Sequence, residues 1–86
     1  MTAFQSFVGV DMASASFMAC AGIAPWKLTV KPVKFENEED GFVFFLDWLK
    51  EHRLTPESTV VCMEATGVYS EGLAYFLYAR GYTVAV

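Results

Sequence analysis

Residues 58–64 read STVVCME, a short apolar run that ends in a carboxylate. An unbroken apolar run of this length, preceded by a proline-containing turn, is typical of a strand buried on both faces of a sheet. The run FQSFVGVD at residues 4–11 follows the same plan, because its apolar residues also end at an acid. These two runs therefore predict two central strands with Asp11 and Glu64 at their carboxyl ends.

Two further strands are expected between these runs. Residues 14–23 alternate small and larger side chains, which favours a second strand. Pro25 interrupts the pattern, and residues 26–35 resume it as a third strand. Because proline cannot donate a hydrogen bond to a neighbouring strand, Pro32 predicts that this third strand lies at an edge of the sheet.

A helix is expected after the third strand, with Asn37 as its N-cap and three acids in its first turn. Its apolar face recurs at three- and four-residue spacing and consists of Phe42, Phe45, Leu46 and Leu49. Lys50, His52 and Arg53 place cations at its negative end, and Pro56 follows the break.

A second helix is expected over roughly residues 68–80, with Thr66 able to cap it and Gly81 ending it in a left-handed conformation. The side chains expected to face inward are Tyr69, Leu73, Phe76 and Leu77. Residues 82–86 begin a last strand. The order of three strands, helix, strand, helix, strand predicts an α/β fold with a ribonuclease-H-like mixed sheet, strand order 3-2-1-4-5, and helices covering its faces.

The composition sets limits on the class of protein. Eighty-six residues form one small domain or an incomplete one, yet 55% of them are hydrophobic, which favours self-association. The net charge of −4 means that the chain lacks the excess of positive charge that attracts nucleic acid. No stretch is apolar enough for a membrane span. Cys20 and Cys62 have no metal-type spacing, so we expect unpaired thiols in a reducing, cytoplasmic setting.

Asp11 and Glu64 are the candidate catalytic residues. If their strands are parallel neighbours, the two backbones lie ~4.8 Å apart and both side chains reach one crevice at the carboxyl edge of the sheet. Two carboxylates this close repel each other unless a proton or a cation lies between them. Mg²⁺ prefers such oxygen ligands together with phosphate oxygens. On spacing alone, an Asp11 that caps a turn and a solvated Glu64 are equally good interpretations.

A resemblance to a known family adds to this picture. The segment FVGVDMAS at residues 7–14 looks like the opening of RuvC-like resolvases and transposases. The segment VCMEATGVY at residues 61–69 is the specific part, and it resembles DEDD-type insertion-sequence transposases related to Piv-type DNA invertases. Further similarity extends the resemblance over essentially the whole chain, at Phe35-Glu-Asn37, Gly41, residues 46–49, Leu73-Ala74, Leu77, Gly81 and Val84.

The resemblance implies that residues 1–86 are the N-terminal portion of a RuvC-like catalytic domain that cleaves and transfers DNA strands. Asp11 and Glu64 would then be the first two of four acidic Mg²⁺ ligands, with the other two beyond Val86. It also implies DNA and a structured guide RNA as partners, and a homo-oligomer is expected. The 86 residues alone are expected to be inactive. One departure is that the usual lysine after the first Asp is missing from residues 13–17.

Two other functions compete with this one. An actin-like or sugar-kinase-type ATPase shares the sheet order and an early Asp, but it needs a glycine-rich turn after that Asp to wrap nucleotide phosphates. Residues 12–15 read MASA and contain no glycine. The other alternative is a non-catalytic, self-associating interaction module, which the apolar excess and the low positive charge favour.

Overall fold

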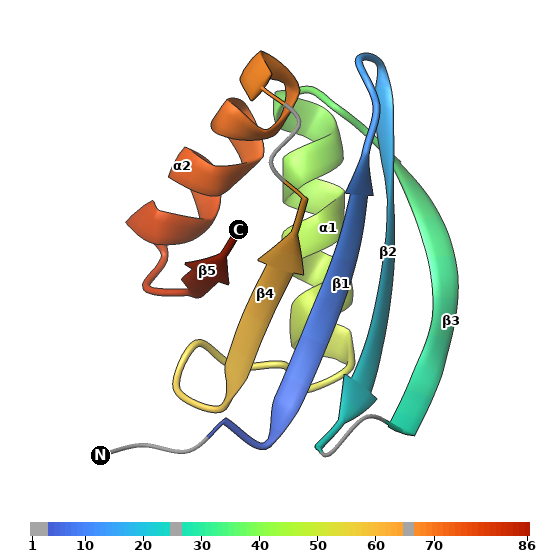
Figure 1. Ribbon diagram of the computed structural model, residues 1–86, viewed down its shortest axis with the longest axis vertical. Coiled ribbons are helices and arrows are strands. Elements are labelled where there is room, and N and C mark those ends of the chain that lie inside the picture. The colour runs from blue at the N-terminus through green and yellow to red at the C-terminus, as the bar shows by residue number, and fades with distance from the viewer. Residues whose placement is uncertain (1–3, 25–26, 65–66) are drawn as a thin grey trace.

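The computed structural model describes residues 4–24, 27–64 and 67–86. Figure 1 shows helices packed on a twisted sheet. In chain order, the elements are β1 (Ser6–Met12), β2 (Ser16–Ile23), β3 (Lys27–Glu36), α1 (Glu39–Glu51), β4 (Thr59–Met63), a 3₁₀ turn (Gly67–Ser70), α2 (Glu71–Ala79) and β5 (Thr83–Ala85). In these described residues, neither helix is long and apolar enough to cross a membrane.

The sheet has the order β3-β2-β1-β4-β5, which confirms the predicted strand order. β1 pairs antiparallel with β2 and parallel with β4, with Phe7 opposite Val60 and Val10 opposite Met63. β3 forms one edge, as Pro32 predicted, and the short β5 forms the other. The first two strands are joined by a tight turn in which the amide of Ala13 donates to the carbonyl of Ser16 at 2.8 Å.

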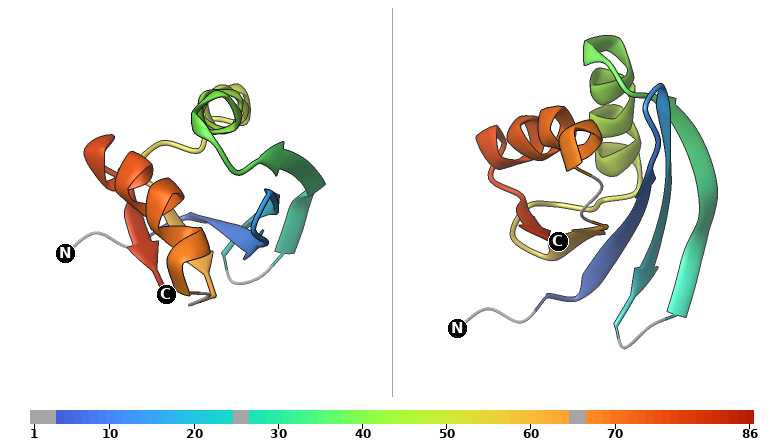
Figure 2. Two further views of the ribbon diagram at one scale, coloured as in Figure 1. Left: turned by 90° about the horizontal axis from the view of Figure 1, so that it is seen from above. Right: turned by 45° about the horizontal axis from the view of Figure 1, so that its top comes forward.

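Both helices pack against the same face of the sheet. Burial alternates along the central strands, so Val8 and Val61 are fully buried whereas Val60 and Cys62 are only half-buried. The expectation that residues 58–64 are buried on both faces is therefore wrong for this structure. The physical reason is that the crossovers from β3 to β4 and from β4 to β5 run in the same direction, and right-handed crossovers then place both helices on one side (Figures 1 and 2).

Aromatic rings fill the core between α1 and the antiparallel part of the sheet. Phe45 lies at the centre, with its ring centroid 5.2 Å from those of Phe17 and Phe35. Trp48 stacks on Phe45 at 5.7 Å and is 7% exposed. Trp48 was not part of the predicted apolar face, and it is buried because it lies three residues after Phe45, on the same face of the helix. Phe44 is 66% exposed.

Both helices begin later than the sequence predicted. The N-cap of α1 is Glu38, which makes no side-chain cap, and the Asn37 side chain binds other parts of the chain instead. α2 begins at Glu71 because residues 67–70 form a 3₁₀ turn, a common start to an α-helix. Tyr69 lies in that turn and is 48% exposed, so its predicted inward position is wrong. The predicted Thr66 cap lies outside the described residues.

Candidate active site

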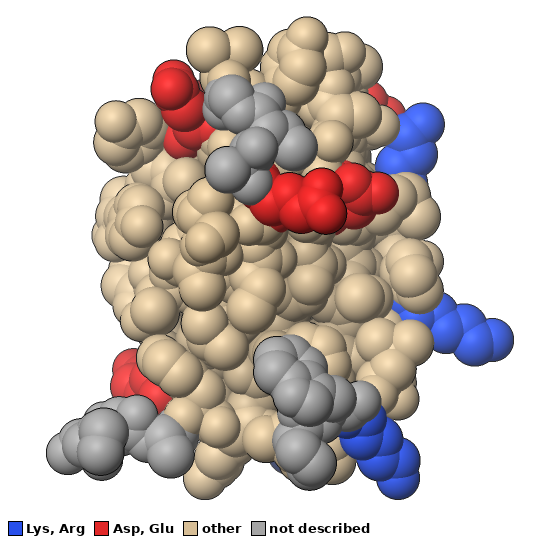
Figure 3. All heavy atoms as spheres, in the orientation of Figure 1, with Lys and Arg blue, Asp and Glu red and all other residues tan. Residues whose placement is uncertain are grey.

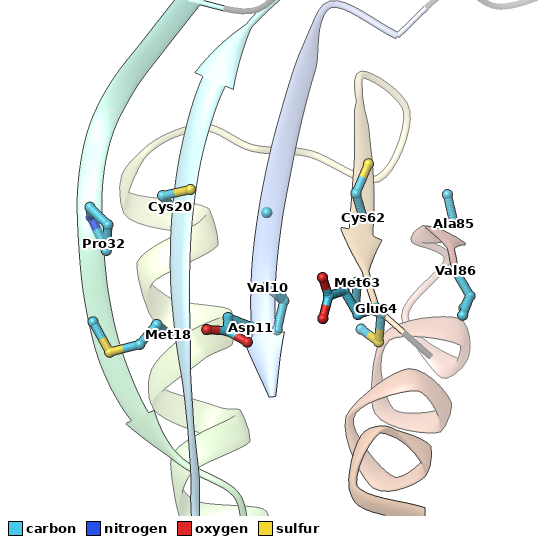
Figure 4. Close-up of a pocket in the computed structure, with 11 residues that line it drawn as sticks. Val10, Asp11, Met18, Cys20, Pro32, Cys62, Met63, Glu64, Ala85 and Val86 are labelled. Carbon is cyan, nitrogen blue, oxygen red and sulfur yellow. The ribbon is translucent and has the colours of Figure 1, made fainter. Parts of the chain in front are cut away.

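The two candidate carboxylates lie side by side at the ends of adjacent parallel strands. Val10 pairs with Met63, so the residues that follow them, Asp11 in β1 and Glu64 directly after β4, lie next to each other at the carboxyl edge. Both side chains are exposed, and both point to the face that the helices leave open. Figure 4 shows the Glu64 carboxylate directed towards β1, the strand that carries Asp11. The predicted adjacency of the two strands is confirmed.

An open hollow of about 740 Å³ extends from the two carboxylates across this uncovered face. Gly9, Cys20 and Cys62 form its floor, and Met18 and Pro32 lie on the β3 side (Figure 4). Gly9 has no side chain, and a Cβ there would lie 3.3 Å from the sulfur of Cys20. Because position 9 is a glycine, no side chain fills this part of the hollow beside Asp11. Both cysteines are unpaired, as predicted.

The surroundings of the carboxylates contain little charge. Figure 3 shows this face as mostly uncharged, with one group of acidic atoms in its upper half, further acidic atoms at its left margin, and basic side chains along the β3 margin. Two neighbouring carboxylates in such surroundings repel each other, and a cation between them removes that repulsion. The oxygen donors and the open hollow beside them suit a hard cation such as Mg²⁺ together with a phosphate-bearing substrate.

Two carboxylates alone do not complete a metal site. Among residues 4–24, 27–64 and 67–86, the structure contains no group of three or more His, Cys, Asp or Glu side chains able to hold a metal. Mg²⁺ requires near-octahedral coordination, so water, substrate oxygens or further ligands would have to supply the remaining positions. The donor chemistry of Asp11 and Glu64 therefore fits part of a magnesium site.

Asn37 positions the loops that follow the two carboxylates, a role that the sequence did not reveal. Its side-chain nitrogen donates to the carbonyls of Ala13 and Ser14, in the turn after β1, at 3.2 and 3.3 Å. The same nitrogen donates to the carbonyl of Tyr69 at 3.0 Å, in the turn before α2. Asn37 thus connects the segment after Asp11 with the segment after Glu64. The sequence marked Asn37 in one other way, because the segment Phe35-Glu-Asn37 is part of the resemblance to the transposase family.

The fold and the site together define a class of protein. This class is an α/β domain with a parallel pair of central strands whose carboxyl ends present two acids on an open face. A family model described as a transposase, of the DEDD type and named for the insertion sequence IS110, matches residues 8–86. The chain belongs to this family of DEDD-type insertion-sequence transposases.

The chain is also similar to curated proteins of the genus Moraxella. It is 27% identical over 82 residues to the pilin gene-inverting protein of Moraxella lacunata, and 29% identical over 82 residues to that of Moraxella bovis. Each alignment covers 95% of this chain and 24% of the relative. The chain therefore spans about a quarter of the length of these relatives.

One solved structure is similar over most of the chain. It is the Ppx/GppA family member of Aquifex aeolicus, with 17% sequence identity and a TM-score of 0.45, covering 95% of this chain and 34% of that one. A likeness at this level carries no argument about the function of the chain.

Proposed function

We propose that this chain contributes Asp11 and Glu64 to the catalytic centre of a metal-dependent transposase or DNA recombinase. The parallel pairing of β1 and β4 carries the proposal, because it sets the two acids next to each other on one open face. Membership of the transposase family supports DNA strand cleavage and transfer as the reaction. The names of the Moraxella relatives support DNA inversion as a related activity.

The role of the two carboxylates in this reaction would be to bind Mg²⁺ and to fix its position. Asp11 would supply oxygen ligands from within β1, and Glu64 would supply them from the position directly after β4. Ligands held on or next to strands are positioned more precisely than ligands in the middle of a loop. Bound Mg²⁺ would supply charge stabilisation for the attacking and leaving oxygens of the phosphoryl transfer. The open hollow beside the carboxylates leaves space for the nucleic-acid backbone on the side of Gly9.

The proposal also includes partners. DNA is the substrate, and a structured guide RNA follows from the family resemblance. We further propose a homo-oligomer, because three large aromatic side chains on the outer faces of the helices are mostly exposed: Phe44 at 66%, Tyr75 at 73% and Tyr78 at 55%. Sedimentation velocity at high micromolar concentration tests this last part, and a strictly monomeric profile would contradict it.

The decisive experiment is the substitution Glu64→Gln in a transposase of the relatives' full length that contains these 86 residues, with strand transfer as the readout. Loss of an outer-shell partner of a metal ligand costs about 10–100-fold, so loss of a ligand itself should lower the rate by more than about 100-fold. RNA binding should stay unchanged, because the variant keeps the shape of the side chain. Glu51→Gln is the matched control, since Glu51 is an exposed glutamate at the end of α1.

A second experiment tests the metal directly on the 86-residue chain. Mn²⁺ accepts the same oxygen ligands as Mg²⁺ and broadens nearby NMR signals because it is paramagnetic. Titration with Mn²⁺ should broaden the amide signals of Asp11, Met12 and Glu64 first, and the paired variant Asp11→Asn with Glu64→Gln should lose this selectivity. Equal broadening at Glu51 and Glu64 would show that Glu64 is an ordinary solvated carboxylate.

A further inference from the structure

A second hollow, of about 520 Å³, lies at the end of the sheet opposite to the two carboxylates. Its lining comes from the second half of α1, the loop between α1 and β4, and the turn between α2 and β5. Leu46 and Leu54 line its α1 side, and Tyr82 lines its α2 side. Because β4 and β5 both begin next to this hollow, it is separated from Asp11 and Glu64 by the full length of the central strands.

Positive charge concentrates around this second hollow. Lys50, Arg53 and Arg80 line it, and these are three of the six Lys and Arg residues in a chain of net charge −4. All three are exposed, and within the described residues none of them forms an ion pair with an acid. Arg80 is held by neutral groups instead: its guanidinium lies 3.6 Å from the centroid of the Phe76 ring and donates to the Phe76 carbonyl.

The backbone at Arg53 is unusual for an arginine. Both helices end in the same way, with the amide of Leu54 bonded to the carbonyl of Leu49 and the amide of Tyr82 bonded to that of Leu77. The residue before each of these amides is left-handed, with φ of 58° at Arg53 and 86° at Gly81. Glycine adopts this conformation without strain, whereas a residue with a Cβ does not. The fold alone would favour glycine at position 53 as well.

The floor of the hollow is apolar and neutral. Leu54 and Tyr82, which follow the two left-handed residues, are both buried, and the Tyr82 hydroxyl donates to the Leu54 carbonyl. Burial raises the pKa of the Tyr82 phenol, and the nearby Glu57 carboxylate raises it further, so the phenol carries no charge near neutral pH. An apolar floor beneath several cations suits a ligand that combines a phosphate with the flat face of a base.

We propose that Lys50, Arg53 and Arg80 form a phosphate-binding pocket for a polynucleotide backbone, separate from the carboxylate site. Guanidinium groups pair with phosphate through two parallel hydrogen bonds, which accounts for an arginine where the backbone favours glycine. The choice of a polynucleotide as the ligand rests on the proposed function, whereas the anion chemistry of the pocket does not.

The substitution Arg53→Gly tests this proposal without damaging the fold, because it relieves the left-handed strain while it removes one cation. The isotope-labelled 86-residue chain is titrated with a single-stranded DNA 12-mer and, in parallel, an RNA 12-mer of the same sequence. Amide shifts should centre on residues 53–56 and 80–82. Arg53→Gly should weaken binding by about fivefold or more and lower the salt slope by roughly 0.7, the value for one phosphate contact on a single strand. Its thermal midpoint should equal or exceed that of the wild type.

Two controls make the experiment decisive. Lys27→Gln removes one positive charge from the far edge strand β3, and it should leave the affinity within about twofold. Unchanged affinity in Arg53→Gly, or an equal loss in Lys27→Gln, would overturn the pocket. Pyrophosphate as a third probe would also overturn it if this small anion shifted residues 53–56 while neither 12-mer did. None of these readouts depends on strand transfer, so failure of the pocket and failure of the carboxylate site are distinguishable.

Discussion

The two faces of the sheet differ although the same strands build both. On the covered face, Val8 and Val61 are fully buried beneath the helices. On the open face, their neighbours Gly9 and Cys62 line a broad hollow with Asp11 and Glu64. Because successive side chains of a strand point to opposite sides, each strand contributes alternate residues to the core and to the site. A substitution at one residue of a strand can therefore change the stability of the core, whereas a substitution at the next residue changes the site.

The largest expected effect is on the covered face. Phe45→Ala removes the central ring of the aromatic core and should lower the free energy of unfolding by about 3–5 kcal/mol. Met18→Ala on the open face, where the side chain is 40% exposed, should cost less than about 1 kcal/mol. Urea unfolding measures both. Equal losses would show that the open face is as tightly packed as the covered one. If Phe45→Ala does not fold, Phe45→Leu provides the same comparison with a smaller loss.

Tyr82→Phe should have the second largest effect, because it leaves the buried carbonyl of Leu54 without its partner. The expected loss is about 1–3 kcal/mol. The raised pKa of Tyr82 gives this loss a pH dependence. The neutral phenol is favoured in the folded state, so its contribution is complete below the ordinary pKa of 10.0 and disappears as the pH rises through the folded value. Unfolding curves between pH 7 and pH 11 should therefore converge for the two proteins, and a constant difference would contradict this.

Asn37→Ala should have a smaller effect on stability but a wide effect on the open face. It removes the hydrogen bonds to the two turns beside the carboxylates, at a cost of about 1 kcal/mol. Amide exchange in residues 13–15 and 67–70 should accelerate, while that in the strands stays the same. Glu38→Ala is the control, because Glu38 makes no side-chain cap. If exchange accelerates in only one of the turns, Asn37 does not connect them.

The smallest expected effect is that of Glu64→Gln on the stability of the 86-residue chain. Removal of one of two neighbouring like charges should raise the thermal midpoint by roughly 1–3 °C, which corresponds to a few tenths of a kcal/mol. Asp47→Asn, which removes an exposed acid away from the ends of α1, should leave the midpoint unchanged. A lower midpoint for Glu64→Gln would mean that the glutamate stabilises the fold. Glu64 would then contribute to stability, as the residues of the covered face do.

The strand order and the position of the acids could be predicted from the sequence because they depend on local patterns. Apolar runs that end in Asp11 and Glu64 indicated two central strands, Pro32 indicated an edge, and Gly81 indicated the end of the second helix. Each of these signals acts within a few residues, since hydrophobic alternation and backbone restrictions are local properties. The adjacency of β1 and β4 then followed from the burial of the two most apolar strands at the centre.

Only the tertiary structure decided which partners the remaining residues have. Asn37 has the residue type of a helix cap, yet its side chain reaches Ala13 and Tyr69, which are 24 and 32 residues away in sequence. The apolar run at residues 58–64 matches a strand covered on both faces, yet both crossovers place their helices on one side. Arg53 lies beside Arg80 in a single hollow because two helix ends meet in space. Local sequence determines the conformation that a segment prefers, whereas contacts between distant segments depend on the direction of the whole chain.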